Sequence, residues 1–337
     1  MSRWTASLAD DPATLVDAVK SILQQEHSHK APVFDRAFWD WQYAQNPSWV
    51  YVLRDENGSI GGYYHVPVYK TLVNGQIKTA GVIQDVAVLP EARGKGEFRK
   101  LAEYAHQDLP GRGVDFIYTY PNEKSIHTFL KYNGYKIVLD YDVFLLPVNP
   151  KRVLDAKAKL PVVNALAAAA IKAFTSLRTV KTPGEPLPIT RFDDRHAGLF
   201  TEKNAPVQRL RSAEYLNWRY FGRPAGEHTA FTLHSNGKNA VVVYKMDVLF
   251  GCPALLLMDF AGDPKTLAAL VRQTAHGADL VFVAGKSPLL TPLAGFFKIP
   301  RRLNPRPLRH LVLDFGNNPH VYDSAAWELS LGDWDVF

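Results

Sequence analysis

Hydrophobic and polar positions change their period along the first 140 residues. Residues 49–53 and 81–89 are apolar runs of strand length, and Asn57-Gly58 after the first run predicts a hairpin. Beyond residue 97 the apolar positions recur at i, i+3, i+4, i+7 and i+11, which is one face of a helix. These positions are Phe98, Leu101, Ala102, Ala105 and Leu109. Strands that lead into amphipathic helices indicate a chain that combines both kinds of element, α+β in class.

A second pair of elements follows the first helix. Gly111-Arg-Gly ends that helix, and residues 114–118 predict a short buried strand. The next helix begins after Pro121-Asn122 and ends at Asn133-Gly134.

The turn between the run at 81–89 and the first helix carries Arg93, Gly94, Lys95 and Gly96. A strand that leads through glycines into a helix brings backbone N–H groups and the positive end of the helix dipole to one point. Such a point binds phosphate or pyrophosphate, because glycines let the backbone approach the anion and the two cations add charge. The turn is neither Gly-x-x-x-x-Gly-Lys-Ser/Thr nor Gly-x-Gly-x-x-Gly, so it differs from the common nucleotide loops.

With these elements in this order, residues 35–147 resemble the GNAT superfamily of acyl-CoA N-acyltransferases. The family motif is Gln/Arg-x-x-Gly-x-Gly/Ala, in which Arg93 fills the first position and Gly96 the fourth. The sixth position, Gly or Ala in the family, is Phe98 here. The helix that begins with Asn-x-x-Ser and the Gly-aromatic pair after it also follow the GNAT order.

The resemblance implies where acetyl-CoA, or another acyl-CoA, would bind as co-substrate. Backbone N–H groups near Val86 and Val88 would pair with the pantetheine arm and the thioester carbonyl, where a fixed N–H stabilises the developing negative charge. The turn Arg93–Phe98 would bind the pyrophosphate, and Asn122 would contact the cofactor. No spacing of His, Cys, Asp or Glu indicates a metal site.

Two residues are candidates for proton transfer. Asp85 is a lone carboxylate in an apolar strand, and a substrate ammonium must lose a proton before it attacks, so Asp85 is the candidate base. Its alternative is a structural aspartate bonded to a nearby backbone group or Tyr. The family's usual acid, a Tyr on the second helix, is Phe129 here, which makes Tyr132 one turn later the candidate acid, with packing as its alternative.

Landmarks of the first half recur in the second half in the same order. Asp40-Trp41-Gln42-Tyr43 matches Asn217-Trp218-Arg219-Tyr220, and a later strand in each copy carries one acid, Asp85 or Asp259. The order and spacing indicate a tandem duplication. The other matches are Asn57-Gly58 with Asn236-Gly237, residues 113–117 with 277–281, and Gly134-Tyr135 with Gly295-Phe296.

The second copy differs at the anion site. Asp263 and Pro264 follow its strand as a helix N-cap and first helical position, and a carboxylate there repels phosphate. We therefore expect two tandem GNAT-like domains, each a twisted mixed sheet flanked by helices, of which only the first keeps the acyl-CoA motif. The expected boundaries are residues 1–149 for the first domain, 150–188 for a helical connector and 189–337 for the second domain.

The connector is rich in Ala, Leu and Lys and predicts a helix that ends before Pro183. Its apolar part, residues 162–174, is too short to span a bilayer, so no stable membrane insertion is expected. The favoured interpretation is a helix packed between the two domains. A helix at a membrane surface, suggested by the flanking basic residues, is the alternative.

Composition narrows the class of protein. The 337 residues allow two or three domains, and one cysteine, Cys252, excludes a disulfide framework. The net charge of +6 is modest, and no dense run of Lys or Arg indicates a nucleic-acid partner. The N-terminus lacks a charged-then-apolar signal pattern, so we expect a cytoplasmic protein.

The expected function is transfer of an acyl group from CoA to an amine of a small molecule or sugar by direct attack. A non-catalytic acyl-CoA-binding module is one alternative, favoured by Phe98 and by the missing family Tyr. An aminoacyl transferase of the peptidoglycan type is another, which the intact turn disfavours because such donors need no pyrophosphate site. The sequence does not indicate the oligomeric state.

Overall fold

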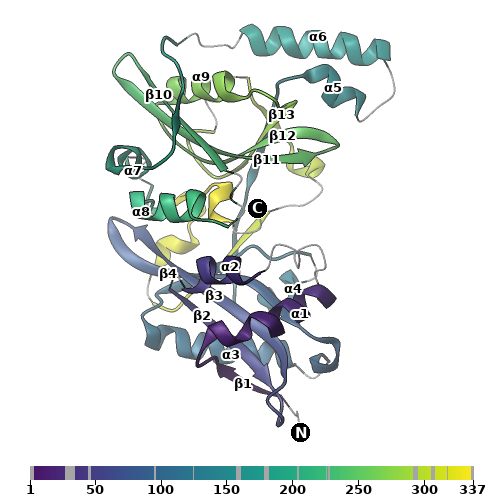
Figure 1. The fold of residues 1–337 in the computed structure, drawn as a ribbon, viewed down its shortest axis with the longest axis vertical. Helices are drawn as coiled ribbons and strands as arrows, with labels where there is room; N and C mark the ends of the chain where they lie inside the picture. The colour runs from purple at the N-terminus through teal and green to yellow at the C-terminus, as the bar shows by residue number, and fades with distance from the viewer. Residues whose placement is uncertain are drawn as a thin grey trace. The chain divides into compact units, whose positions relative to one another are not determined.

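The structure, a computed structural model, divides into two compact units, and neither unit is one continuous stretch of chain (Figure 1). The first combines residues 1–140 with 308–326, and the second combines 141–307 with 327–337. The residues described are 4–26, 35–44, 47–94, 96–123, 125–156, 161–177, 182–202, 205–224, 226, 228–290, 295–304, 308–316 and 318–334.

The first unit is a mixed sheet in which only β4 and β5 pair in parallel. The strand order is β1 (Thr5–Leu8), β2 (Ser48–Arg54), β3 (Ile60–Val73), β4 (Gln76–Val88), β5 (Phe116–Thr119), β15 (Arg309–Asp314) and β6 (Lys136–Asp140). Its helices are α1 (Val16–Glu26), α2 (Arg36–Trp39), α3 (Glu97–Asp108) and α4 (Ile126–Tyr132).

Helices cover both faces of this sheet. Tyr51 and Leu53 of β2 pack with α3 and α4, whereas Val50 and Val52 pack with α1. Successive strand residues point to opposite faces, so the alternation that marks β2 as a strand also gives it two buried sides.

The second unit repeats the plan, and only β12 and β13 of its main sheet pair in parallel. The strand order is β8 (Leu187–Ile189), β10 (His228–Ser235), β11 (Lys238–Leu249), β12 (Cys252–Gly262), β13 (Leu280–Gly285), β7 (Asp142–Pro147) and β14 (Phe297–Ile299). The strands β9 (Val207–Arg209) and β16 (Trp327–Glu328) pair with each other. The helices are α5 (Pro150–Asp155), α6 (Pro161–Leu177), α7 (Asp194–Thr201), α8 (Ala213–Leu216) and α9 (Pro264–Thr274).

The two mixed sheets with their helices confirm the α+β class, and their matching strand orders agree with a duplication. The hairpins expected at the two Asn-Gly pairs are confirmed. In the second of them, Asn236 and Gly237 have φ of 49° and 72° between the paired ends of β10 and β11, as a tight two-residue turn requires.

The halves of the chain exchange one strand. In the first unit β15, which comes from the C-terminal part of the sequence, lies between β5 and β6. In the second unit β7, made early, lies between β13 and β14. Only Tyr141 separates β6 from β7, yet the two strands belong to different sheets. The consecutive domains expected from the sequence do not anticipate this exchange.

The connector helix α6 has apolar side chains on its exposed side. Val162 and Leu166 are 72% and 70% exposed, whereas Asn164 is buried and donates from Nδ2 to Asp155 Oδ1 at 2.9 Å. The interpretation of this helix as one packed between the two domains stays a prediction. Among the described helices, none is both long and apolar enough to cross a membrane.

Candidate functional site

The parallel strands β4 and β5 pair over only four residues each. The ladder runs from Ala80 opposite Phe116 to Ile83 opposite Thr119, where β5 ends. Strand β4 continues to Val88. Its backbone beyond Ile83, which includes Val86, therefore runs past the end of β5 and no longer has that strand as its partner.

A bulge interrupts β4 at this point. Tyr63 lies opposite Ala87 and His65 opposite Gln84, so Asp85 and the residue after it share one partner on β3. Asp85 has a φ of 49°, in the left-handed region that few residues other than glycine adopt. Because a bulge turns side chains out of the regular alternation, it gives Asp85 a direction that a plain strand would not.

The side chain of Asp85 belongs to a three-residue chain of polar contacts. The Tyr43 hydroxyl donates to Asp85 Oδ2 at 3.2 Å and lies 2.7 Å from His65 Nδ1. Since the hydroxyl hydrogen is used on the carboxylate, we assign the proton of His65 to Nδ1, which leaves Nε2 as an acceptor. Asp85 itself is half-buried.

Local sequence places Tyr43 at this position. Asp35 caps α2 by accepting from Phe38 N at 2.8 Å, and α2 then widens into one π-helical turn over Asp40–Ala44 that carries Tyr43. The second copy has the same arrangement, with Ser212 capping α8 and a π-helical turn over Asn217–Phe221. Such turns within helices occur often at functional sites.

Burial sets the charge state of His65. Its side chain has no exposed surface, and desolvation lowers its pKa to about 3, although the charge of Asp85 acts in the opposite direction. His65 is therefore neutral near pH 7. Its Nε2 and the buried hydroxyl of Tyr63 have no hydrogen-bond partner among the described residues. Buried polar atoms without partners are rare in native proteins and often mark a place for a ligand or water.

The turn before α3 keeps the features of an anion site. Gly94 and Gly96 have φ of 88° and 83°, and an added Cβ at either would meet no atom within 4 Å. Gly96 is the N-cap of α3 and offers no side-chain cap, so the first N–H groups of the helix receive no bond from it. Arg93 Nε donates to Val88 O at 2.7 Å and fixes the turn to the end of β4. The buried Glu97 carboxylate lies 3.7 Å from Lys100 Nζ.

The remaining candidates fall in different places. Lys95 lies outside the described residues. Phe98 packs edge-to-face on Phe129, with ring centroids 5.8 Å apart, so it belongs to the core under α3. Asn122 accepts from Ser125 N at 3.0 Å and begins the turn into α4. Tyr132 is 42% exposed and lies near Arg99 and Lys131. The roles of Asn122 and Tyr132 toward a ligand stay predictions.

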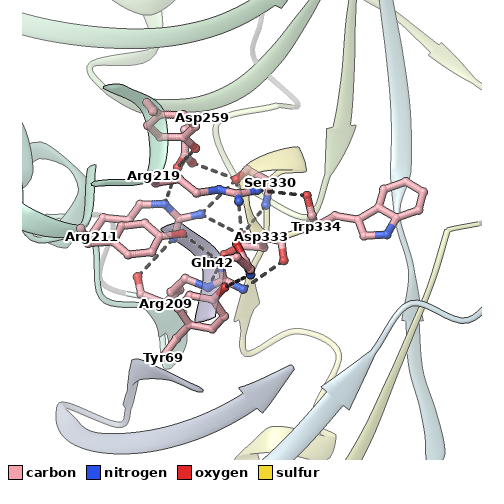
Figure 2. A network of polar contacts seen from close by, with 11 residues as sticks. Gln42, Tyr69, Arg209, Arg211, Arg219, Asp259, Ser330, Asp333 and Trp334 are labelled. Atoms are coloured by element: carbon pink, nitrogen blue, oxygen red, sulfur yellow. Dashed lines mark hydrogen bonds and ion pairs between the residues drawn. The ribbon is translucent and has the colours of Figure 1, made fainter. Parts of the chain in front are cut away.

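In the second copy the carboxylate that matches Asp85 is buried and fully hydrogen-bonded. Asp259 is fully buried and accepts from Tyr220 Oη at 2.8 Å, from Arg211 Nε at 2.7 Å and from Ser330 Oγ at 2.8 Å. Figure 2 shows Arg211 between Asp259 and Asp333, whose Oδ2 lies 2.8 Å from Arg211 Nη2. Burial opposes charge on Asp333, but the charges of Arg211 and Arg209 and the hydrogen bonds to the carboxylate together outweigh it and hold the pKa of Asp333 low. This carboxylate network is closed to a ligand.

The predicted helix start of the second copy is confirmed. Asp263 caps α9 and accepts from Thr266 N at 3.0 Å and Lys265 N at 3.2 Å. Burial raises the pKa of Asp263, but these hydrogen bonds outweigh it and keep the pKa below its usual range. A charged carboxylate therefore occupies the helix end where the first copy has Gly96.

Sequence reasoning did not name Tyr43 as the partner of Asp85 and did not identify His65 as a site residue. The signal that could have found Tyr43 is the repeat itself, because each copy pairs a Tyr after Trp-x with the strand acid. His65 gave no such signal, since a lone His in an apolar strand is typical of a core. Cys252 is buried, as a structural cysteine would be. The described residues contain no group of three His, Cys, Asp or Glu that could hold a metal.

Comparison with known proteins agrees with the geometry of the first unit. Residues 10–138 match the family model described as "Acetyltransferase (GNAT) domain". No curated protein matches the sequence.

Several solved structures share the fold over most of the chain. A GCN5-related N-acetyltransferase from Anabaena variabilis is 12% identical, with 92% of this chain and 72% of that chain covered and a TM-score of 0.62. One from Kribbella flavida is 14% identical, with 92% and 71% covered and a TM-score of 0.56. The N-myristoyltransferase of Saccharomyces cerevisiae with bound myristoyl-CoA is 11% identical, with 95% and 80% covered and a TM-score of 0.59. At these identities the likeness is one of fold.

Proposed function

We propose, from the GNAT acetyltransferase domain that residues 10–138 form, that this chain transfers an acyl group from acyl-CoA to an amine of a small molecule. Acetyl-CoA is the donor we favour. The observation that carries the proposal is the joint placement of three features along the chain: the run of β4 beyond Ile83 that no longer pairs with β5, the bulge at Asp85 and the glycine turn that follows.

Each feature has a role in the proposed reaction. The backbone N–H groups of Val86 and Val88 stabilise the thioester carbonyl oxygen as it gains negative charge. The turn with Gly94 and Gly96 and the start of α3 bind the pyrophosphate.

Asp85 accepts the proton that the substrate ammonium must lose, and Tyr43 holds the carboxylate in place through its hydroxyl. The amine then attacks the carbonyl carbon, the C–S bond breaks, and the leaving CoA thiolate takes up the proton that the nitrogen loses as the amide forms.

A panel of primary amines tests this proposal. The full chain is incubated with acetyl-CoA and each amine, and free CoA thiol is measured against time. Amine-dependent release of thiol above the hydrolysis background supports the proposal. If acetyl-CoA binds in calorimetry and no amine is acylated, the second candidate, a non-catalytic acyl-CoA-binding module, replaces it. The exposed position of Tyr132, the candidate acid, is what favours that second candidate.

A further inference from the structure

One segment holds the whole excess of positive charge in this chain. Residues 150–181 contain seven Lys or Arg and one Asp, a formal charge of +6, which equals the net charge of the entire protein. The other residues carry 32 basic and 32 acidic side chains and are formally neutral. The modest net charge of the protein is therefore concentrated in residues 150–181.

Within this segment α6 exposes its apolar side chains. Val162, Val163 and Leu166 are 72%, 59% and 70% exposed, whereas the polar Asn164 and Thr175 are buried. A helix packed on a protein core shows the opposite distribution.

Specific contacts fix this orientation within the second unit. Asn164 bonds to Asp155 of α5, and Arg272 of α9 donates to Thr175 O at 3.3 Å. Phe174 packs on Phe297 of β14, with ring centroids 5.1 Å apart. Figure 1 shows α6 running beside α5. Because the polar side of the helix is held inward, its apolar side faces solvent.

Cations line a cavity between α6 and α5. A cavity of about 600 Å³ next to α6 is lined by Lys151, Arg152, Lys172 and Asp279, together with small residues. Lys151 pairs with Asp155 at 2.6 Å and Arg152 with Asp279 at 3.6 Å. Lys172 makes no ion pair within the described part of the chain.

We propose that α6 and this cavity form a docking surface for an anionic lipid bilayer. Val162, Val163 and Leu166 enter the boundary between headgroups and acyl chains, and the cations of the cavity face the lipid phosphates. A second copy of the chain would also cover an apolar face, but two segments of +6 would then meet and repel, whereas an anionic surface complements them. The proposal does not depend on the acyltransferase function.

Vesicle sedimentation of the full chain tests the proposal. The probes are phosphatidylcholine vesicles with and without about 30% phosphatidylglycerol. We expect partitioning onto the anionic vesicles to be about tenfold stronger or more than onto the neutral ones, and to be largely lost in about 0.5 M NaCl. Equal binding to both vesicles, or no binding at low salt, overturns the proposal.

Matched variants distinguish binding through the exposed face of α6 from nonspecific binding of the protein to vesicles. Leu166→Glu should weaken binding to anionic vesicles by about tenfold or more. Val248→Glu, at a site 67% exposed in β11 of the same unit, should bind as the original chain does. Unchanged binding by Leu166→Glu contradicts the proposal.

A last pair of measurements decides whether the exposed face of α6 binds an anionic bilayer or a second copy of the chain. Lys172→Glu should weaken binding to anionic vesicles and leave the small binding to neutral ones unchanged. It also carries the test if Leu166→Glu fails to give a cooperative thermal transition. If light scattering shows a dimer that Leu166→Glu abolishes, and no vesicle binds, the face belongs to a second copy and the lipid proposal is wrong.

Discussion

The pairs Tyr43–Asp85 and Tyr220–Asp259 are the same two side chains in two environments. In the second copy Arg211 adds a buried ion pair, and the carboxylate has no exposed surface. In the first copy the carboxylate stays half-buried. The same Tyr–Asp pair can therefore have different roles in the two copies, because its surroundings decide whether the carboxylate can accept a proton from a bound molecule.

Replacement of Asp85 tests its role as the base. Asp85→Asn should lower the rate of amine acylation by roughly 10²–10⁴-fold, the usual contribution of a positioned base, with little change in acetyl-CoA affinity. Asp115→Asn is the control, because Asp115 also contacts β4 and accepts from Thr79 N at 2.8 Å. A loss below about threefold, with an intact fold, would leave Asp85 as a structural residue.

His65 gives the stability of the first unit a pH dependence. The unfolded histidine binds a proton below its ordinary pKa of 6.5, whereas the buried one does so only near 3. The stabilising difference is therefore complete above pH 6.5 and is lost as the pH falls toward 3. At pH 5 the loss is about 2 kcal/mol.

Urea unfolding at pH 7.5 and pH 5 measures this contribution. In His65→Gln the difference in unfolding free energy between the two pH values should shrink by about 2 kcal/mol. His127→Gln, at an exposed position on α4, should leave the difference unchanged. An equal pH dependence in His65→Gln and the original chain would show that His65 is not buried as a neutral group.

At the scale of elements, the glycine turn between β4 and α3 is the most direct test of acyl-CoA binding. Gly96→Leu should weaken acetyl-CoA binding by about 1–3 kcal/mol, because the side chain would stand where the anion meets the helix N–H groups. The control is Gly58→Leu. Gly58 has nearly the same φ, 82°, and the same open surroundings, but lies in the β2–β3 turn. Calorimetry showing equal affinity for both variants would remove the turn from the site.

Several individual elements could be predicted correctly from the local sequence. The helix at 97–108, the cap at Asp263 and the Asn-Gly turns all depend on residues a few positions apart, so the chain carries their signal directly. The bulge at Asp85 and the contact with His65 depend on register between strands. Register is set by the packed sheet and has no local signature. The sequence left two interpretations of α6, a helix packed between the domains and a helix at a membrane surface, because apolar residues alone do not decide which side of a helix is covered.

At the scale of the whole molecule, we expect the two copies to have different roles. Asp263 occupies the helix end where the first copy has open glycines, so the second unit should bind no acyl-CoA. Calorimetric titration with acetyl-CoA should give one site per chain. Two equivalent sites, or CoA found beside Asp263 in a crystal, would contradict this division.

The exchanged strand makes the first 149 residues, which contain the match to the GNAT domain model, incomplete when they are expressed alone. Residues 1–149 lack β15, so β6 has no neighbour and one edge of β5 is open. We expect this fragment to lack a cooperative thermal transition, and a flexible linker that joins residues 308–326 to residue 140 to restore one. A scrambled 308–326 segment on the same linker is the control. Cooperative melting of the fragment alone would show that β15 is dispensable.

The position of β15 in the sequence also delays completion of the first sheet during synthesis. After β6 leaves the ribosome, residues 141–308 have to be made before the strand between β5 and β6 exists. At roughly 5–20 residues per second this interval lasts roughly ten to thirty seconds. An open β5 edge during that time can accept β15 from a neighbouring nascent chain on the same message. The yield of such interlocked dimers should therefore rise with the density of ribosomes and fall when translation initiates slowly.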